Sequence, residues 1–160
     1  MKKIFLLVAF IATTLVQTAF AQDGHNGHHT AASVLTSYYS LKDALVAGDA
    51  IIANAKALEL NKAIEGTDEK TLSSKEKEEL LKHSKLISGT KEIKAQREHF
   101  APLSIVMISA AKSKKLSADI IYVQYCPMKK SSWLSSEKAV KNPYYGSSML
   151  TCGKISETIN

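Results

Sequence analysis

Two pairs of sulfur-containing residues near the C-terminus carry the chemistry that is easiest to recognise in this sequence. Cys126 is followed two residues later by Met128, and Met149 precedes Cys152 by three residues. Pro127 stiffens the backbone of the first pair, and one turn of chain is enough to bring the second pair together. Thiolates and thioethers are soft ligands that favour Cu(I), and Ag(I) by the same reasoning, over hard cations. The four residues are therefore predicted to form a site for copper or silver.

The same two cysteines also fit a disulfide. Two cysteines in an exported chain commonly pair, and a bond between Cys126 and Cys152 would close a loop of about 25 residues, worth ~3–4 kcal/mol in the chain-entropy description. Met128 and Met149 would then either fill the core or remain as metal ligands beside the disulfide. A structural zinc site is disfavoured, because the chain has neither two C-x-x-C pairs nor histidines at the usual spacing. Both the thiolate site and the disulfide stay open.

Histidines supply a second set of candidate ligands. Three of the five histidines, His25, His28 and His29, lie in the polar segment 22–30, and short histidine-rich tracts bind metals. Among the others, His99 is the stronger candidate for the sulfur site, whereas His83 lies in the most highly charged predicted helix.

The residues around the sulfur pairs are unusually rigid. Trp133, Tyr144 and Tyr145 lie between the two cysteines, and they are expected either to shield a metal from solvent or to form a hydrophobic lid over the helices. We call the whole segment, residues 125–153, the cap.

The N-terminus has the features of a secretory signal peptide. Two lysines precede a mostly apolar run, Ile4 to Val16, and the sequence Ala19-Phe20-Ala21 matches a cleavage site. The expected address is therefore periplasmic or extracellular, with 1–21 as signal, 22–30 as a disordered leader and 31–160 as one domain. Cleavage after Gln22 instead of Ala21 would create an Asp-Gly-His terminus suited to Cu(II) or Ni(II).

The body of the chain has the periodicity of amphipathic helices. Helices are predicted over 31–47 after an N-cap at Thr30, over 50–64 after Asp49, from the Ser73 capping box to about residue 87, and from about 91 to 115. Pro102 predicts a kink or break in the last one. Residues 118–126 and 152–159 have a strand-like pattern and are expected to pair. The predicted fold is thus mainly α, an antiparallel four-helix bundle with an irregular C-terminal cap and a short two-stranded β element.

Charge composition argues against several classes of function. The net charge is +6, but lysines alternate with acids along the helices instead of forming a basic stripe, so nucleic-acid binding is not expected. No segment after the signal is predicted to cross the membrane. The chain has no serine–histidine–aspartate pattern, no phosphate-binding loop and no carboxylate pair in an apolar setting, so an enzyme is not expected.

Several motifs resemble the domain-of-unknown-function family numbered 3347, a bacterial periplasmic domain found alone or joined to heavy-metal efflux adaptors. The similar segments lie across the mature chain: YY-x-LKDALVAGD at 38–49, QREHF-x-x-LS at 96–104, then YCPM, WLSS, NPYYG and ML-x-CG within the cap. The resemblance implies a helical module with a role in copper or heavy-metal handling, with Cys126, Met128, Met149 and Cys152 at its site and His99 beside them. Its members often carry a longer insert after CPM, where this chain has two lysines.

Two functions follow as expectations. The first is an exported Cu(I)/Ag(I)-binding module that sequesters the metal or passes it to an efflux adaptor or another copper protein. The alternative is a metal-free interaction module of the cell envelope, with its cap held by a Cys126–Cys152 disulfide. The methionine beside each cysteine favours the first.

Overall fold

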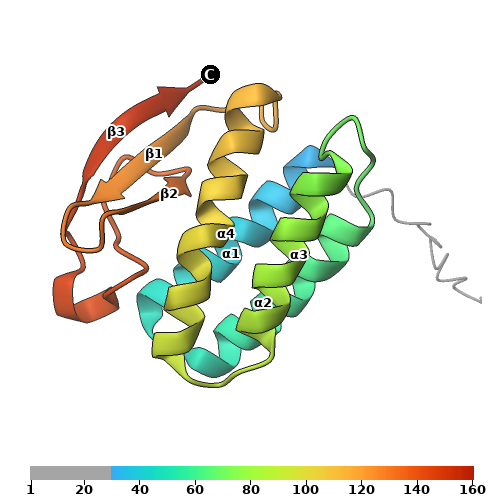
Figure 1. Cartoon of the computed structure of the whole chain (residues 1–160). Helices are drawn as coiled ribbons and strands as arrows, with labels where there is room; N and C mark the ends of the chain where they lie inside the picture. The colour runs from blue at the N-terminus through green and yellow to red at the C-terminus, as the bar shows by residue number, and fades with distance from the viewer. Residues whose placement is uncertain (1–29) are drawn as a thin grey trace, which may run out of the picture.

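The computed structural model describes residues 30–160, which form four helices followed by a small antiparallel sheet (Figure 1). This confirms the mainly helical fold class. The signal peptide, the histidine leader and the possible cleavage sites lie outside the described residues. None of the described helices is long and apolar enough to cross a membrane. The elements are α1 (Ala31–Ala47), α2 (Ala50–Glu65), α3 (Ser74–Ser88), α4 (Ile93–Ser113), β1 (Ile121–Cys126), β2 (Ser131–Ser135), the 3-10 helix η1 (Gly146–Met149) and β3 (Lys154–Ile159).

The helix boundaries follow local capping chemistry. The Asp49 carboxylate accepts hydrogen bonds from the backbone N–H groups of Ile51 and Ile52 at 3.0 and 2.9 Å, and Ser73 forms the predicted capping box with Glu76. Both predicted caps are confirmed. The prediction for Thr30 was wrong in its chemistry, because this residue holds the N-cap position of α1 but its side chain makes no capping hydrogen bond.

Pro102 does not interrupt α4, which runs unbroken from Ile93 to Ser113. The expected break is therefore absent. Successive helices pack on one another, α1 on α2, α2 on α3 and α3 on α4. Their shared core is built mainly from leucine, isoleucine and alanine side chains.

The sheet has three strands in the order β2-β1-β3, not the two that were predicted. β1 pairs with β3 as expected, and β2 adds to its other edge with Gln124 opposite Trp133. The sequence Ser-Ser-Trp-Leu-Ser gives β2 little strand signal of its own. Its position is set by pairing with β1 and by burial of Trp133 and Leu134 against the helices.

The sheet lies beside α4, on the side away from α3 (Figure 1). A buried hydroxyl group fastens the two layers. The Tyr38 hydroxyl of α1 shares a 2.7 Å hydrogen bond with Ser104 Oγ of α4 and accepts a 3.1 Å bond from the Leu134 N–H of β2. Its ring stacks on Phe100 with the centroids 5.2 Å apart. Three segments that are distant in the chain therefore meet at one side chain.

A second fastening joins the cap to the end of α1. Arg97 of α4 donates from Nη2 to the Leu45 carbonyl oxygen at 2.8 Å, where the C-terminal end of a helix carries partial negative charge. Gly146 at the start of η1 lies against this pair with φ of +56°. An added Cβ would collide with the Arg97 guanidinium and lie 2.8 Å from the Val46 carbonyl oxygen. Glycine is required there both for its backbone angle and for space.

Removal of the Tyr38 hydroxyl should destabilise the whole described fold. Tyr38→Phe keeps the ring but leaves Ser104 Oγ and the Leu134 N–H buried without this partner, which costs about 1–3 kcal/mol. Urea unfolding followed by circular dichroism measures the loss. Tyr39→Phe is the matched control, because Tyr39 is half-buried and makes no hydrogen bond through its hydroxyl among those found in residues 30–160. Equal stabilities for the two variants would contradict the assigned role of Tyr38.

Candidate metal site

The two cysteines of the cap lie next to each other as free thiols. Cys126 is the last residue of β1, and Cys152 lies two residues before β3. The pairing of Tyr125 with Lys154 brings the two chains together at this end of the sheet. The two Sγ atoms are 3.7 Å apart. The pairing of residues that the sequence left open between a ligand set and a disulfide is therefore a pairing in space.

Asn142 holds the return of the chain to β3. Its backbone N–H donates to the Leu150 carbonyl oxygen at 2.8 Å, and its side-chain amide donates to the Cys152 carbonyl oxygen at 2.7 Å. Its Oδ1 accepts the Tyr144 N–H at 2.9 Å. The Asn-Pro sequence indicates only a turn, and nothing in it shows that the asparagine side chain is buried and fixes a cysteine.

Gly153 allows the close approach beside Cys152. An added Cβ would lie 2.9 Å from the Tyr125 carbonyl oxygen and 3.0 Å from Cη2 of Trp133. A larger residue would push this strand away from β1 and separate the sulfur atoms.

The two thiols differ in acidity. Burial disfavours the Cys126 thiolate, but hydrogen bonds from the Lys129 N–H, at 3.4 Å, and from Asn142, Cys152 and the Met128 N–H outweigh it and lower the pKa of Cys126. The pKa of Cys152 is raised, first because its thiol donates to Cys126 and then by burial. Cys126 is thus the sulfur that ionises first, with Cys152 stabilising it as a donor.

Both methionines of the cap lie at the surface. Met128 is 63% exposed and Met149 is 38% exposed. Neither is a core filler. Their backbones adjoin the thiols, because the Met128 N–H points to the two sulfur atoms and the Cys152 N–H donates to the Met149 carbonyl oxygen at 3.0 Å.

The aromatic residues lie beneath the cap. Trp133 is fully buried and meets the Tyr144 ring edge-on at 5.8 Å, while the Tyr144 hydroxyl donates to the Ser132 carbonyl oxygen at 2.6 Å. Tyr144 also contacts Phe100 of α4, with the ring centroids 6.0 Å apart. Tyr145 is half-buried. The first two rings form the hydrophobic contact between cap and helices, the second of the two roles expected from the sequence.

His99 is placed apart from the thiols. Its ring lies 6.3 Å from the ring of His83, across the contact between α3 and α4. The neighbouring residues Arg97 and Phe100 are the ones on α4 that reach the cap. Residue 97 projects about 200° around the helix from residue 99, because each residue turns the helix by about 100°. The structure therefore groups His99 with His83, while His25, His28 and His29 lie outside the described residues.

Hard ligands do not gather around the thiols. Within residues 30–160, no three histidine, cysteine, aspartate or glutamate side chains come together in a way that could hold a metal. A metal bound by the two cysteines would take any further ligand from a methionine or from a partner molecule.

The difference in thiol acidity can be measured directly. In Cys152→Ser the remaining Cys126 should titrate at a lower pH than the remaining Cys152 does in Cys126→Ser. The reason is that the introduced serine hydroxyl is still a donor near Cys126, whereas Cys152 lacks the backbone donor from Lys129. Ultraviolet thiolate absorbance against pH gives both curves. The opposite order, or superimposable curves, would contradict the hydrogen-bond assignment.

Comparison with known proteins gives one family. A sequence model of the family described as "Protein of unknown function (DUF3347)" matches residues 34–119, from the first turn of α1 to the segment just before β1. The cap motifs that carried the resemblance within 125–153 lie outside the matched range. No curated protein and no solved structure matched the chain. Since the match covers more than half of the chain, the protein belongs to the DUF3347 family.

Proposed function

We propose that this protein binds Cu(I) or Ag(I) through Cys126 and Cys152, with Met128 and Met149 as additional ligands, and either sequesters the ion or transfers it. The observation that carries the proposal is the approach of two free thiols to 3.7 Å beside two exposed methionines. Sulfur in both chemical forms, thiol and thioether, is the ligand type that soft monovalent ions prefer.

The distance between the sulfur atoms suits a single bridging ion. With metal–sulfur bonds of about 2.3 Å, the observed separation of 3.7 Å corresponds to an S–metal–S angle of about 107°. An ion can therefore bind both thiolates with the backbone in place. That angle leaves room for one or two more ligands, which Met128 and Met149 can supply by rotation of their exposed side chains.

The electrostatics also favour a bound cation with two thiolates. The pKa of Cys126 is lowered by hydrogen bonds, so this ligand is easily deprotonated. Two thiolates and one Cu(I) carry a net charge of −1, and the adjacent Lys129 and Lys130 offset it. The exposed thioethers supply ligands that can exchange with those of a partner, a feature suited to transfer. The partner class that fits is a heavy-metal efflux adaptor or another copper protein.

The remaining features fit an exported binding module better than an enzyme. The signal-like N-terminus supports a periplasmic address, and the short connections between successive helices support an antiparallel four-helix bundle. Titratable groups with a nucleophile–base–orienter arrangement were not found among the described residues.

A disulfide-stapled interaction module is the second candidate, and the same distance favours it. The sulfur atoms need to approach by only about 1.7 Å to reach the disulfide bond length of about 2.05 Å. In an oxidising compartment the cap would then be held covalently and the thiolates lost. The two candidates differ in redox state and in the role of the methionines.

Anaerobic Cu(I) titration against a chromogenic chelator tests the proposal. Cys126→Ser and Cys152→Ser should each weaken Cu(I) binding by more than about a hundredfold, because loss of mere supporting contacts to a metal ligand already costs up to that much. Met128→Leu with Met149→Leu should weaken it less. Met107→Leu is the control, since Met107 is buried in α4 away from the cap.

Three other outcomes would contradict the thiolate site. Wild-type binding in both cysteine variants would exclude it, and loss of binding only on removal of residues 22–30 would place the metal on the histidine leader. Absence of binding by the reduced protein, together with a Cys126–Cys152 disulfide in the secreted protein, would favour the stapled interaction module.

A further inference from the structure

A cavity between α4 and the cap carries positive charge that its surroundings do not balance. Its volume is about 370 Å³. Lys94 and Arg97 of α4 and Lys129 of the cap line it, and the one acid in its lining is Glu98. The cavity adjoins the thiol pair through Lys129, whose N–H donates to Cys126, but its lining contains none of the sulfur residues.

The cations of this cavity have no acidic partners in the described part of the chain. None of the ion pairs among residues 30–160 involves Lys94, Arg97, Glu98 or Lys129. The lining therefore has an excess of two positive charges.

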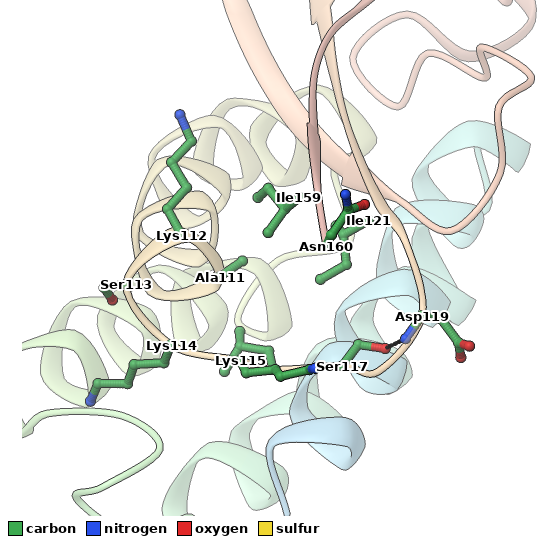
Figure 2. A pocket seen from close by; sticks show the side chains of 11 residues that line it. Ala111, Lys112, Ser113, Lys114, Lys115, Ser117, Asp119, Ile121, Ile159 and Asn160 are labelled. Atoms are coloured by element: carbon green, nitrogen blue, oxygen red, sulfur yellow. Dashed lines mark hydrogen bonds between the residues drawn. The ribbon is translucent and has the colours of Figure 1, made fainter.

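A second lysine-rich cavity shows the contrast. It measures about 150 Å³ and lies where α4 ends near β1 and β3. Figure 2 shows the side chains of Lys112 and Lys114 pointing away from it. They pair with Glu157 at 2.5 Å and with Glu76 at 3.6 Å. Its positive charges are thus accounted for within the protein, whereas those of the larger cavity are not.

Arg97 adds an unsatisfied donor. Its Nη2 donates to the Leu45 carbonyl oxygen, but its Nε is buried and has no acceptor among the described residues. Buried polar atoms without a partner are rare in folded proteins, and many of those that occur bind an ion, a water molecule or a ligand. A guanidinium is also the side chain best shaped to bind a carboxylate through two parallel hydrogen bonds.

Two tyrosines give the cavity an apolar side. The rings of Tyr144 and Tyr145 line it opposite the cations. Burial raises the pKa of Tyr144, so this phenol stays neutral and does not compete for the cations. A cavity with cations on one side and aromatic rings on the other suits a ligand with an acidic end and an apolar body.

We propose that this cavity binds a carboxylate attached to an apolar or aromatic group, with Arg97, Lys94 and Lys129 holding the acid and Tyr144 and Tyr145 packing on the apolar part. A free small acid and the C-terminal carboxylate of a peptide share this chemistry. Glu98 disfavours a doubly charged anion, because like charges repel at short range. The site needs no metal, so its failure or success is independent of the copper proposal.

Calorimetric titration of the full secreted chain with phenylacetate and with phenylacetamide tests the charge requirement. Phenylacetate should bind and the neutral amide should not. Lys129→Gln should weaken phenylacetate binding by about three- to tenfold, as expected for one partly exposed charge. Lys130→Gln is the matched control, because it removes the same charge from the next residue, which is exposed and outside the cavity lining, and it should change binding by less than about twofold.

A second arm distinguishes the two sources of carboxylate. A short peptide ending in phenylalanine is titrated with a free and with an amidated C-terminus. Tighter binding of the free-ended peptide than of phenylacetate assigns the site to chain ends, and the reverse assigns it to small acids. Equal binding of acids and amides, equal losses in Lys129→Gln and Lys130→Gln, or no binding of any of these probes would overturn the proposal.

Discussion

The hydroxyl group of Tyr38 is the contact on which the arrangement of cap and helices depends. It is buried at the meeting point of α1, α4 and β2, where it is hydrogen-bonded to Ser104 and to the Leu134 N–H. A buried polar group without partners is costly, so these three segments satisfy one another only when the sheet lies on α4. Burial and the nearby Tyr144 raise the pKa of Tyr38, and the phenol is neutral wherever the protein is folded at ordinary pH. The contact is therefore insensitive to physiological changes in pH.

Everything of chemical interest in the described chain lies on the cap side of that contact. The thiol pair forms because β3 returns alongside β1, and β1 is itself held by β2, whose Trp133 and Leu134 are buried against the helices. The cationic cavity forms because the same docking brings Lys129 and two tyrosines opposite α4. Correct docking of the cap thus creates two neighbouring but separate sites, one of soft sulfur and one of positive charge.

Some of this organisation could be predicted from the sequence and some could not. The helices could, because apolar periodicity and the capping residues Asp49 and Ser73 are local signals. The approach of Cys126 and Cys152 could be anticipated only as an alternative, since a ligand pair and a disulfide impose the same proximity. β2 was missed because its serine-rich sequence depends on pairing with a partner strand and on burial of two side chains.

Other features depend on which way a helix faces. His99 lies in a stretch that also reaches the cap, yet its own side chain points toward α3, and periodicity alone does not say which neighbour each face meets. The same reason hid the cavity, whose cations come from α4 and from a loop more than thirty residues later. Asn142 has the sequence context of a turn residue, and its hydrogen bond to the Cys152 carbonyl oxygen exists only in the folded cap.

X-ray absorption spectroscopy at the copper edge, on protein loaded with one equivalent of Cu(I), tests the central claim most directly. The proposal predicts that the atoms bonded to copper are sulfur alone, at about 2.3 Å, with the number of sulfur scatterers falling in Cys126→Ser and Cys152→Ser. Nearest neighbours that are mainly nitrogen, with the more distant scattering pattern of imidazole, would contradict it. That result would move the metal from the thiol pair of the cap to the histidines.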